Sequence, residues 1–543
     1  MSVRLPTRFA ELRPVQADAV TRITDAWARG VKVVIWQAPV GAGKTIGAVA
    51  SAERAQIDRC LYVCSGRQLQ DQFARDFPCA VLKGRSNYPT MRAGWFADSC
   101  NKMGKGENAV CTFCDPVADC AYQTAKRTAL GADLACVNTT YFLTEANGPG
   151  GFAGWPLVVV DEADALEGEI MRYLEFKVPV STARQLGLEV PRKGVHRGTQ
   201  QAWLTELSMA AAKAGAGIRV TGGEDGAAAA KEKSRLLRMA GRAGTLAEQI
   251  AEDGGTGAWV RTYDDGDNGA FVLKPVTVDE HAHDLVWDNA ERWLVMSGTI
   301  LSAERFAADL GLDGDEWEFI DSPSTFPAEN RPVVVCGIAN MNKREMETTD
   351  AVDRMVAAVQ AVVDRHGGEN ILIHCHTYAL ARRLAAEVRP DDGRMVHEYT
   401  SSRDREAVVA RFRRSGGVLV APSLARGVDL PDDLCRVMIV CKMPFGYLGD
   451  PQIKARMSMQ GGQTWYDMNT ARELMQMTGR GVRHEGDWAV SYVLDGGFLK
   501  TVWKRKTLFP TWWREAVVPA TARQVLEGTV ALAGLPEKVA ADA

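Results

Sequence analysis

The sequence lacks any unbroken run of about 20 apolar residues, the length that a helix needs to cross a bilayer. It also lacks an excess of one charge, because 64 basic residues nearly balance 68 acidic ones, for a net charge of −4. That balance neither suggests nor excludes a nucleic-acid partner. The start of the chain carries Arg4 and Arg8 without an apolar stretch, so we expect no signal peptide. We therefore expect no membrane partner and a cytoplasmic location, in a bacterial or phage-infected cell.

Apolar runs alternate with helix-like segments in two separate parts of the chain. Its 543 residues, 46% of them hydrophobic, are too many for one core, and about three or four domains are expected. Buried apolar strands separated by helices are typical of a parallel sheet. The predicted fold class is therefore α/β, with two parallel-sheet lobes. The predicted strands are residues 31–36, 61–64 and 157–160 in the first lobe and 371–373, 418–420, 437–441 and 489–494 in the second, and the predicted helices of the first lobe are residues 45–56 and 67–77.

Two segments interrupt this alternation. Residues 83–135 hold a cluster of cysteines, and residues 166–277 are rich in alanine and in long charged residues. Within the second segment, residues 200–214 and 227–251 have helical composition, and glycine-rich stretches mark their ends. This composition predicts a helical insertion into the first lobe.

The first third of the chain contains a candidate phosphate-binding loop at residues 38–45 (APVGAGKT). A predicted strand precedes it and a predicted helix follows, which disfavours the alternative of a chance glycine-rich turn. Glycines let successive backbone N–H groups turn towards phosphates. Lys44 is expected to reach the β- and γ-phosphates of ATP, and the Thr45 hydroxyl to bind Mg²⁺. The predicted nucleotide-binding residues of the loop are Gly41, Ala42, Gly43, Lys44 and Thr45.

Residues 158–164 (VVVDEAD) form an apolar strand that ends in two carboxylates. Ligands bind at the carboxyl edge of such a sheet. Asp161 is therefore expected to hold Mg²⁺, directly or through water. Glu162 is the candidate base for the attacking water. A solvated strand end is the alternative, and the phosphate loop earlier in the chain makes it less favourable.

Two further segments fit a nucleotide site. Gln16 precedes the loop, and its amide offers both a donor and an acceptor for an adenine edge. In the second lobe, Arg480 and Arg483 are three residues apart and share one helix face, as would suit a γ-phosphate in its transition state. The alternative is a salt-bridged helix surface. We include Gln476, Arg480 and Arg483 with Glu162 and Asp161 in the predicted catalytic set.

Together these motifs resemble those of superfamily 2 helicases with two RecA-like P-loop lobes. Residues 82–88 and 120–138 resemble the segments that enter and leave the cluster domain of the XPD/DinG-type iron–sulfur DNA helicases. Residues 297–299 (SGT), 322–326 and 371–378 resemble further motifs of that family, in family order. Residues 423–431 also resemble a motif of that family. This resemblance adds Asp429 to the predicted nucleotide-binding residues.

The resemblance implies an ATP-dependent helicase that moves 5′-to-3′ along single-stranded DNA, acts on forked or tailed duplex DNA, and carries a 4Fe–4S cluster and a helical arch domain. We expect a monomer, and its protein partners are not indicated by the sequence. The predicted domains are residues 1–82, 137–168 and 278–328 for the first lobe, 83–136 for the Fe–S domain, 169–277 for the arch, 329–530 for the second lobe and 531–543 for a flexible tail.

Four cysteines have the spacing C-x10-C-x2-C-x5-C: Cys100, Cys111, Cys114 and Cys120. Four thiolates in one short segment suit a 4Fe–4S cluster, although C-x2-C is also half of a zinc site. In the family the first cysteine normally follows the Asn-Tyr pair at residues 87–88. Here Pro and Thr follow it, so Cys100 takes that place, with Cys136 or Cys79 as alternatives.

Two groups of residues are candidates for nucleic-acid contacts. Basic residues of the predicted arch could meet phosphates or form a solvated helix face: Lys231, Lys233, Arg235, Arg238 and Arg242. Trp503, Trp512 and Trp513 could stack on bases, but such tryptophans more often close a core. Two other activities stay open: an RNA helicase or duplex translocase without strand separation, and a non-hydrolysing, ATP-switched clamp on nucleic acid.

Overall fold

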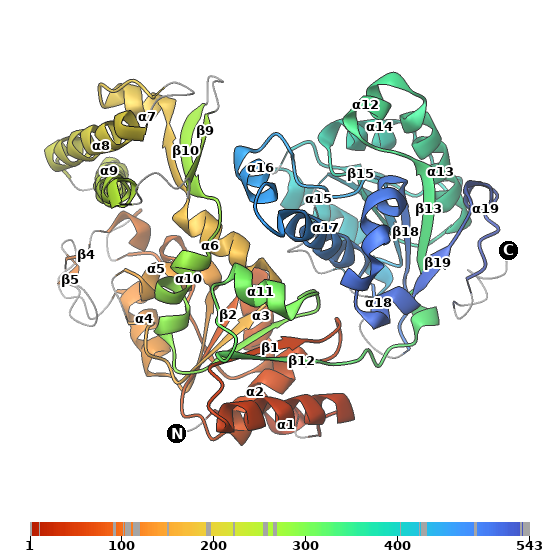
Figure 1. The fold of residues 1–543 in the computed structure, drawn as a ribbon, viewed down its shortest axis with the longest axis horizontal. Helices are drawn as coiled ribbons and strands as arrows, with labels where there is room; N and C mark the ends of the chain where they lie inside the picture. The colour runs from red at the N-terminus through yellow and green to blue at the C-terminus, as the bar shows by residue number, and fades with distance from the viewer. Residues whose placement is uncertain are drawn as a thin grey trace.

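The chain folds into two α/β lobes with an extra domain on the first lobe (Figure 1). The structure is a computed structural model. Within its described part, no helix is long and apolar enough to cross a membrane. The described residues are 3–9, 11–90, 94–100, 102–103, 110–111, 120–148, 151–191, 197–220, 223–252, 259–263, 269–401, 403–422, 424, 430, 432–479, 481–482, 486–532 and 535.

The first lobe is built on a sheet of seven parallel strands. Both faces are buried: Val33 and Ile35 point into one core, and Val34 and Trp36 into the other. Such burial on two faces explains the unbroken apolar runs of the sequence. From edge to edge the strands are β12 (Trp317–Asp321), β1 (Val33–Gln37), β11 (Trp293–Ser297), β7 (Leu157–Asp161), β2 (Cys60–Cys64), β6 (Leu134–Asn138) and β3 (Ala80–Val81).

Helices cover both faces of this sheet. One face packs on α1 (Pro14–Ala28), α2 (Lys44–Arg54) and α3 (Arg67–Asp76). The opposite face packs on α4 (Ala121–Gly131), α5 (Thr139–Ala146), α6 (Leu166–Leu174), α10 (Asp279–Leu285) and α11 (Ala303–Asp309). The predicted strands and helices of this lobe are confirmed, with bounds shifted by one or two residues.

The second lobe repeats the design with a second seven-stranded parallel sheet. Its predicted strands are confirmed as well. In order the strands are β15 (Val396–Glu398), β16 (Val418–Ala421), β14 (Ile371–His374), β17 (Val437–Val440), β18 (Val490–Asp495), β13 (Val333–Ala339) and β19 (Val517–Pro519). The helices are α12 (Lys343–Thr348), α13 (Ala351–Arg365), α14 (Tyr378–Glu387), α15 (Arg405–Ser415), α16 (Pro451–Met457), α17 (Gly462–Thr478), α18 (Thr511–Glu515) and α19 (Ala522–Leu526).

The insertion into the first lobe combines helices with a sheet, whereas a purely helical domain was predicted. Its long helices are α8 (Arg197–Gly217) and α9 (Gly223–Glu252), preceded by the short α7 (Val180–Gln185). A three-stranded antiparallel sheet accompanies them, in the order β8 (Phe176–Pro179), β10 (Ala270–Pro275) and β9 (Trp259–Tyr263). The domain has its own core, in which Trp203 packs on Phe271.

Helix α8 runs through the glycines that were expected to end it, because its tertiary packing outweighs their low helix propensity. At the C-terminus, Leu532 and Leu535 are buried in the core of the second lobe. Packed chain therefore extends beyond residue 530, where the flexible tail was expected to begin, since the two leucines find an apolar surface beside α13 and α19.

The cysteine-containing segment follows strand β3. Two short strands, β4 (Lys102–Met103) and β5 (Val110–Cys111), pair in antiparallel fashion, with Lys102 opposite Cys111. This pairing places the backbone of Cys111 opposite that of Lys102, two residues after Cys100. The segment also meets the insertion, because Lys231 Nζ of α9 lies 2.7 Å from Asp98 Oδ2.

Candidate nucleotide site between the lobes

The phosphate loop joins β1 to α2, and its glycines adopt backbone angles that favour glycine. Gly41 and Gly43 have φ angles of 77° and 79°, in the left-handed region. A Cβ atom on Gly43 would lie 2.0 Å from Gln16 Nε2. Because Gly43 has no side chain, the first N–H groups of α2 are left to bind an anion. The loop predicted from the sequence therefore has the geometry that phosphate binding requires.

Lys44 opens α2 and folds back over the loop. Its ammonium donates hydrogen bonds to the carbonyl oxygens of Ala38, at 3.0 Å, and Pro39, at 3.4 Å. These carbonyls hold the charge at the mouth of the loop. A bound phosphate would offer the ammonium stronger, charge-assisted partners.

The start of α1 lies against the same loop. Gln16 is 3% exposed, donates to the Gly43 carbonyl at 3.3 Å and accepts from the Arg13 N–H at 2.9 Å. Arg13 Nη2 donates to the Gly41 carbonyl at 2.8 Å. Gln16 is thus adjacent to the nucleotide loop, and its contact with adenine stays a prediction.

Asp161 ends β7 beside the loop, where the Mg²⁺ site was predicted. Its Oδ2 accepts from the Tyr62 hydroxyl at 2.8 Å, and its Oδ1 accepts from the Glu162 N–H at 3.0 Å. The Tyr62 hydroxyl also lies 3.5 Å from Thr45 Oγ1, so Tyr62 joins the two predicted Mg²⁺ ligands. Burial raises the pKa of Asp161, and the charge of Lys44 opposes that shift. A divalent cation would favour the carboxylate further.

Glu162 is met by a residue of the other lobe. Its backbone is left-handed, with φ 54°, an uncommon conformation for a residue other than glycine. Gln476 Nε2, near the end of α17, lies 3.2 Å from Glu162 Oε2 and 3.2 Å from Thr299 Oγ1. Glu162, the candidate base, and Gln476, a predicted catalytic residue of the second lobe, are therefore in direct contact.

The Ser-Gly-Thr segment after β11 links these residues. The Ser297 hydroxyl donates to Asp164 Oδ1 at 2.7 Å and lies 3.3 Å from the Thr299 hydroxyl. From α17, Arg472 donates to the carbonyls of Thr299, at 3.3 Å, and Ile300, at 3.2 Å. The Ser-Gly-Thr segment is thus hydrogen-bonded both to Asp164, which follows β7, and to Arg472 of the second lobe.

Several predicted residues cannot be placed. Arg480, Arg483, Asp429 and Cys114 lie outside the described residues. The residue before Arg480 does approach the phosphate loop, because a Cβ atom on Gly479 would lie 3.8 Å from Val40 Cγ2. The chain that leads to the two arginines therefore starts at the nucleotide site.

The outer predicted cluster ligands, Cys100 and Cys120, are both buried. Arg85 contacts residues at or near both cysteines. It donates a hydrogen bond to the Cys100 carbonyl at 2.5 Å, and its guanidinium lies over the ring of Tyr122, two residues after Cys120. Cys136 lies in the core on the opposite face of the first sheet from Cys120, and Cys79 packs against that opposite core. The sheet therefore separates both alternatives from Cys120. Within the described residues, no three His, Cys, Asp or Glu side chains form a metal-binding group.

Most of the candidate nucleic-acid residues contact other protein groups. Trp513 is buried and stacks on Phe509, and Trp503 and Trp512 pack against the same core. This arrangement agrees with the core-closing alternative. On the insertion, Lys231 pairs with Asp98 and Arg235 with Glu232, while Arg242 donates to the carbonyls of Tyr173 and Leu174.

Two residues of the site, Tyr62 and Arg472, were not predicted. Tyr62 lies in an apolar strand, where a tyrosine is expected to be a core residue. The position of Arg472 could have been inferred from its spacing. It precedes Gln476 by four residues on one helix, which places both side chains on the same face.

Known protein families match both lobes. The family described as "Helicase C-terminal domain" matches residues 360–516, and "Type III restriction enzyme, res subunit" matches residues 9–168. The ATP-dependent DNA helicase YoaA of Escherichia coli is 22% identical, over 89% of this chain and 91% of that protein. The ATP-dependent DNA helicase DinG of Photobacterium profundum is 22% identical, over 44% of this chain and 36% of that protein.

The fold is that of a solved XPD helicase. The two share 13% sequence identity and superpose with a TM-score of 0.63, over 94% of this chain and 100% of that one. A second XPD structure gives a TM-score of 0.56 at 12% identity, over 93% of this chain and 100% of that one. In its two sheet-built lobes and in the phosphate loop that faces α17, the chain is similar to these helicases.

Proposed function

We propose that the chain is an ATP-dependent DNA helicase that moves 5′-to-3′ along single-stranded DNA and opens forked or tailed duplexes. The observation that carries the ATPase part is the contact of Gln476, from the second lobe, with Glu162 and Thr299 of the first. The direction of movement and the single-stranded track rest on the family resemblance. The DNA helicases YoaA and DinG among the relatives support DNA over RNA as the substrate.

The residues of the site divide the work of hydrolysis. The N–H groups of the loop and Lys44 bind the phosphates, and Thr45 and Asp161 would hold Mg²⁺, which would neutralise phosphate charge. Glu162 orients and deprotonates the attacking water. Arg480 and Arg483 complete the site by neutralising charge on the γ-phosphate as the bond breaks.

Contact between the two lobes makes hydrolysis depend on lobe closure. Gln476 bonds to the base and to the Ser-Gly-Thr segment at once, so ATP binding and lobe spacing are coupled. Each cycle of closing and opening would shift the lobes along a bound strand. DNA would bind mainly through its phosphate backbone, with little reading of base sequence.

For the cysteines we propose a 4Fe–4S cluster held by Cys100, Cys111, Cys114 and Cys120. The burial of Cys100 and Cys120 and the pairing of β4 with β5 support convergence of the four. Zinc on the same residues is the alternative. The cluster would hold a small domain together. Iron and sulfide content with absorbance near about 400 nm supports the cluster, and stoichiometric zinc without iron contradicts it.

Strand-displacement assays test the activity. Duplexes with 5′ or 3′ tails, of DNA or RNA, would be incubated with protein purified under anaerobic conditions, ATP and Mg²⁺. We expect displacement on the 5′-tailed DNA. Lys44→Ala is expected to abolish it and to leave part of the DNA binding. Equal displacement from RNA tails would favour an RNA helicase, and DNA binding without phosphate release would favour an ATP-switched clamp.

A further inference from the structure

One face of α17 lies along the first lobe over most of its length. Trp465, Asn469, Arg472 and Gln476 are spaced by four, three and four residues, so they lie in one stripe on the helix. Gln476 and Arg472 contact the nucleotide site, as described above. Trp465 is eleven residues before Gln476, about 16 Å along the helix axis, and lies outside that site. The two ends of the stripe therefore contact different parts of the first lobe.

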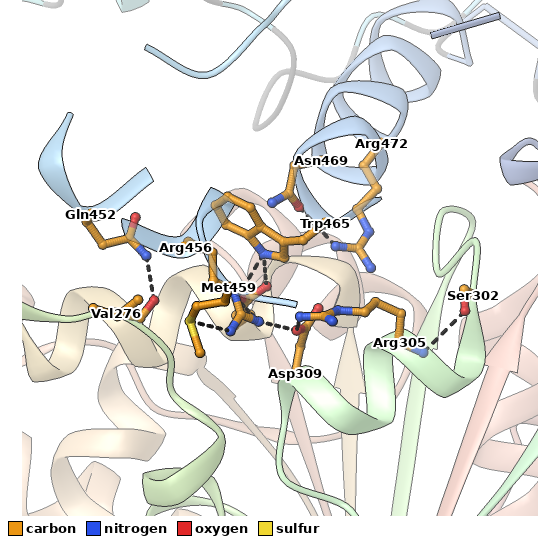
Figure 2. Close-up of polar contacts among 11 residues, drawn as sticks. Val276, Ser302, Arg305, Asp309, Gln452, Arg456, Met459, Trp465, Asn469 and Arg472 are labelled. Atoms are coloured by element: carbon orange, nitrogen blue, oxygen red, sulfur yellow. Dashed lines mark hydrogen bonds and ion pairs between the residues drawn. The ribbon is translucent and has the colours of Figure 1, made fainter. Parts of the chain in front are cut away.

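At the far end of the stripe, Trp465 of α17 and Arg456 of α16 meet two acidic residues of the first lobe, Glu167 and Asp309. Figure 2 labels Asp309 together with Trp465 and Arg456. The indole N–H of Trp465 lies 3.1 Å from each carboxylate oxygen of Glu167 on α6. Arg456 of α16 forms an ion pair with Asp309 of α11 and lies 3.9 Å from Glu167 Oε1. The side chains of Arg456 and Asp309 are only 5% and 2% exposed.

Burial makes this contact sensitive to lobe spacing. An ion pair removed from water is favourable only with close contact and further hydrogen bonds. Arg305 donates to Asp309 from within the first lobe, and the Arg456 guanidinium lies over the Trp465 ring. When the lobes separate fully, water hydrates Arg456 and Asp309. At intermediate spacings the two side chains have neither the close ion pair nor full hydration. The contact therefore defines one closed distance between the lobes.

We propose that Arg456 and Trp465 are positioning residues, whose docking on Asp309 and Glu167 sets the closed geometry in which α17 presents Gln476 to Glu162. The inference rests on the proposed ATPase function but concerns residues that do not touch the nucleotide. We call the four residues Arg456, Trp465, Asp309 and Glu167 the closure contact.

The same short helix also bonds to the insertion. Gln452 Nε2 of α16 lies 2.8 Å from the Val276 carbonyl, at the root of the insertion, and Lys274 Nζ lies 3.1 Å from Asp450 Oδ2 (Figure 2 shows the first pair). One element of the second lobe thus touches both the closure contact and the insertion. When the lobes close, α16 transmits that closure to the insertion as well.

The test compares three measurements on the full chain with DNA: kcat for ATP hydrolysis, Kd for a fluorescent ADP, and the radius of gyration from small-angle X-ray scattering with ADP and beryllium fluoride. Arg456→Met removes the charge but keeps most of the volume. We expect kcat to fall about a hundredfold, the order expected when one partner of a buried pair is removed. The Kd should stay within about twofold, and the radius of gyration should remain at its nucleotide-free value.

Arg456→Lys is expected to recover part of kcat, since it restores the charge. The matched control is Arg172→Gln, which removes an exposed guanidinium that pairs with Glu169 on the helix that carries Glu167. It should leave all three measurements unchanged. If Arg456→Met does not fold, Trp465→Phe takes its place, because it keeps an aromatic ring while it removes the indole N–H and part of the side-chain volume.

The inference is overturned if a folded Arg456→Met or Trp465→Phe protein closes and hydrolyses ATP like the wild type. It is also overturned if these variants lose ADP affinity and melting temperature in proportion to kcat, since that pattern indicates a purely structural role. If the wild type hydrolyses no ATP, the proposed function fails, and scattering with ADP and beryllium fluoride still tests the closure contact.

Discussion

The two lobes share one architecture and differ at the point where a nucleotide would bind. In the first lobe, β1 is followed by a glycine loop, and α2 begins with no capping side chain. In the second, β14 is followed by a helix, α14, whose N-cap residue Thr377 accepts a hydrogen bond from the Leu380 N–H with its hydroxyl. A capped terminus has fewer N–H groups for an anion. The second lobe instead contributes the side chains of α17.

This difference shows how one sheet design performs two tasks. In the proposed function, the first lobe would hold the phosphates through backbone groups, which need particular glycines. The second lobe would reach the same phosphates from a helix face, which needs particular side chains at helical spacing. A duplicated fold can therefore supply both halves of one site without two nucleotides being bound.

The largest effect in this comparison is expected at the base of the first lobe. Glu162→Gln keeps the shape of the side chain but cannot take a proton, so kcat for ATP hydrolysis should fall about 100- to 10,000-fold. Binding of ATP should persist, because the loop and Lys44 are intact. Steady-state phosphate release and equilibrium ATP binding are the measurements. Hydrolysis near the wild-type rate would assign the base to another residue.

A smaller effect is expected from the second lobe's side of the same contact. Gln476→Ala removes the hydrogen bonds to Glu162 and Thr299, and we expect kcat to fall about tenfold, as for loss of one or two hydrogen bonds to partly buried groups. The stimulation of hydrolysis by DNA should weaken more than the basal rate. A change confined to KM would indicate that Gln476 binds substrate rather than coupling the lobes.

The closure contact between the two lobes should make the stability of the folded protein depend on pH. Burial, followed by the charge of Asp309, raises the pKa of Glu167 to about 7, while Arg456 and Arg472 oppose the shift. A carboxyl group with a raised pKa stabilises the folded protein at low pH, and that contribution is lost as pH rises towards 7. From pH 5 to 8, the melting temperature of the wild type should therefore fall relative to that of Glu167→Gln. Parallel melting curves for the two proteins across this range would contradict the assignment.

The smallest effect is expected at the capped helix of the second lobe. Thr377→Ala removes the cap of α14 and should lower the free energy of unfolding by about 1 kcal/mol. Denaturant unfolding monitored by circular dichroism measures this. Nucleotide affinity should not change, because this helix end has no part in phosphate binding. A loss of ADP affinity in this variant would mean that the two lobes divide the nucleotide differently.

Local patterns predicted most of the fold and part of the site. The strands follow from short apolar runs and are confirmed near the predicted bounds. Gly41 and Gly43 of the predicted phosphate loop have left-handed backbones, and phosphate binding by the loop stays a prediction. The strands β8, β9 and β10 of the insertion were not predicted, because the helical composition around them dominated. Tyr62 and Asp161 are 99 residues apart in sequence, and Arg456 and Asp309 are 147 apart. Such pairs depend on how the chain folds back on itself, which residue spacing alone does not encode.

Helix α6 begins four residues after Glu162 and ends two residues before β8, the first strand of the insertion. Its nine residues form a stiff rod of about 14 Å between Glu162, the proposed base, and the insertion. Tension on a DNA strand bound by the insertion would therefore pull on the proposed base. Turnover of ATP should then vary with applied load, and a force-dependent rate in a single-molecule trap would be the mechanical signature of that rod.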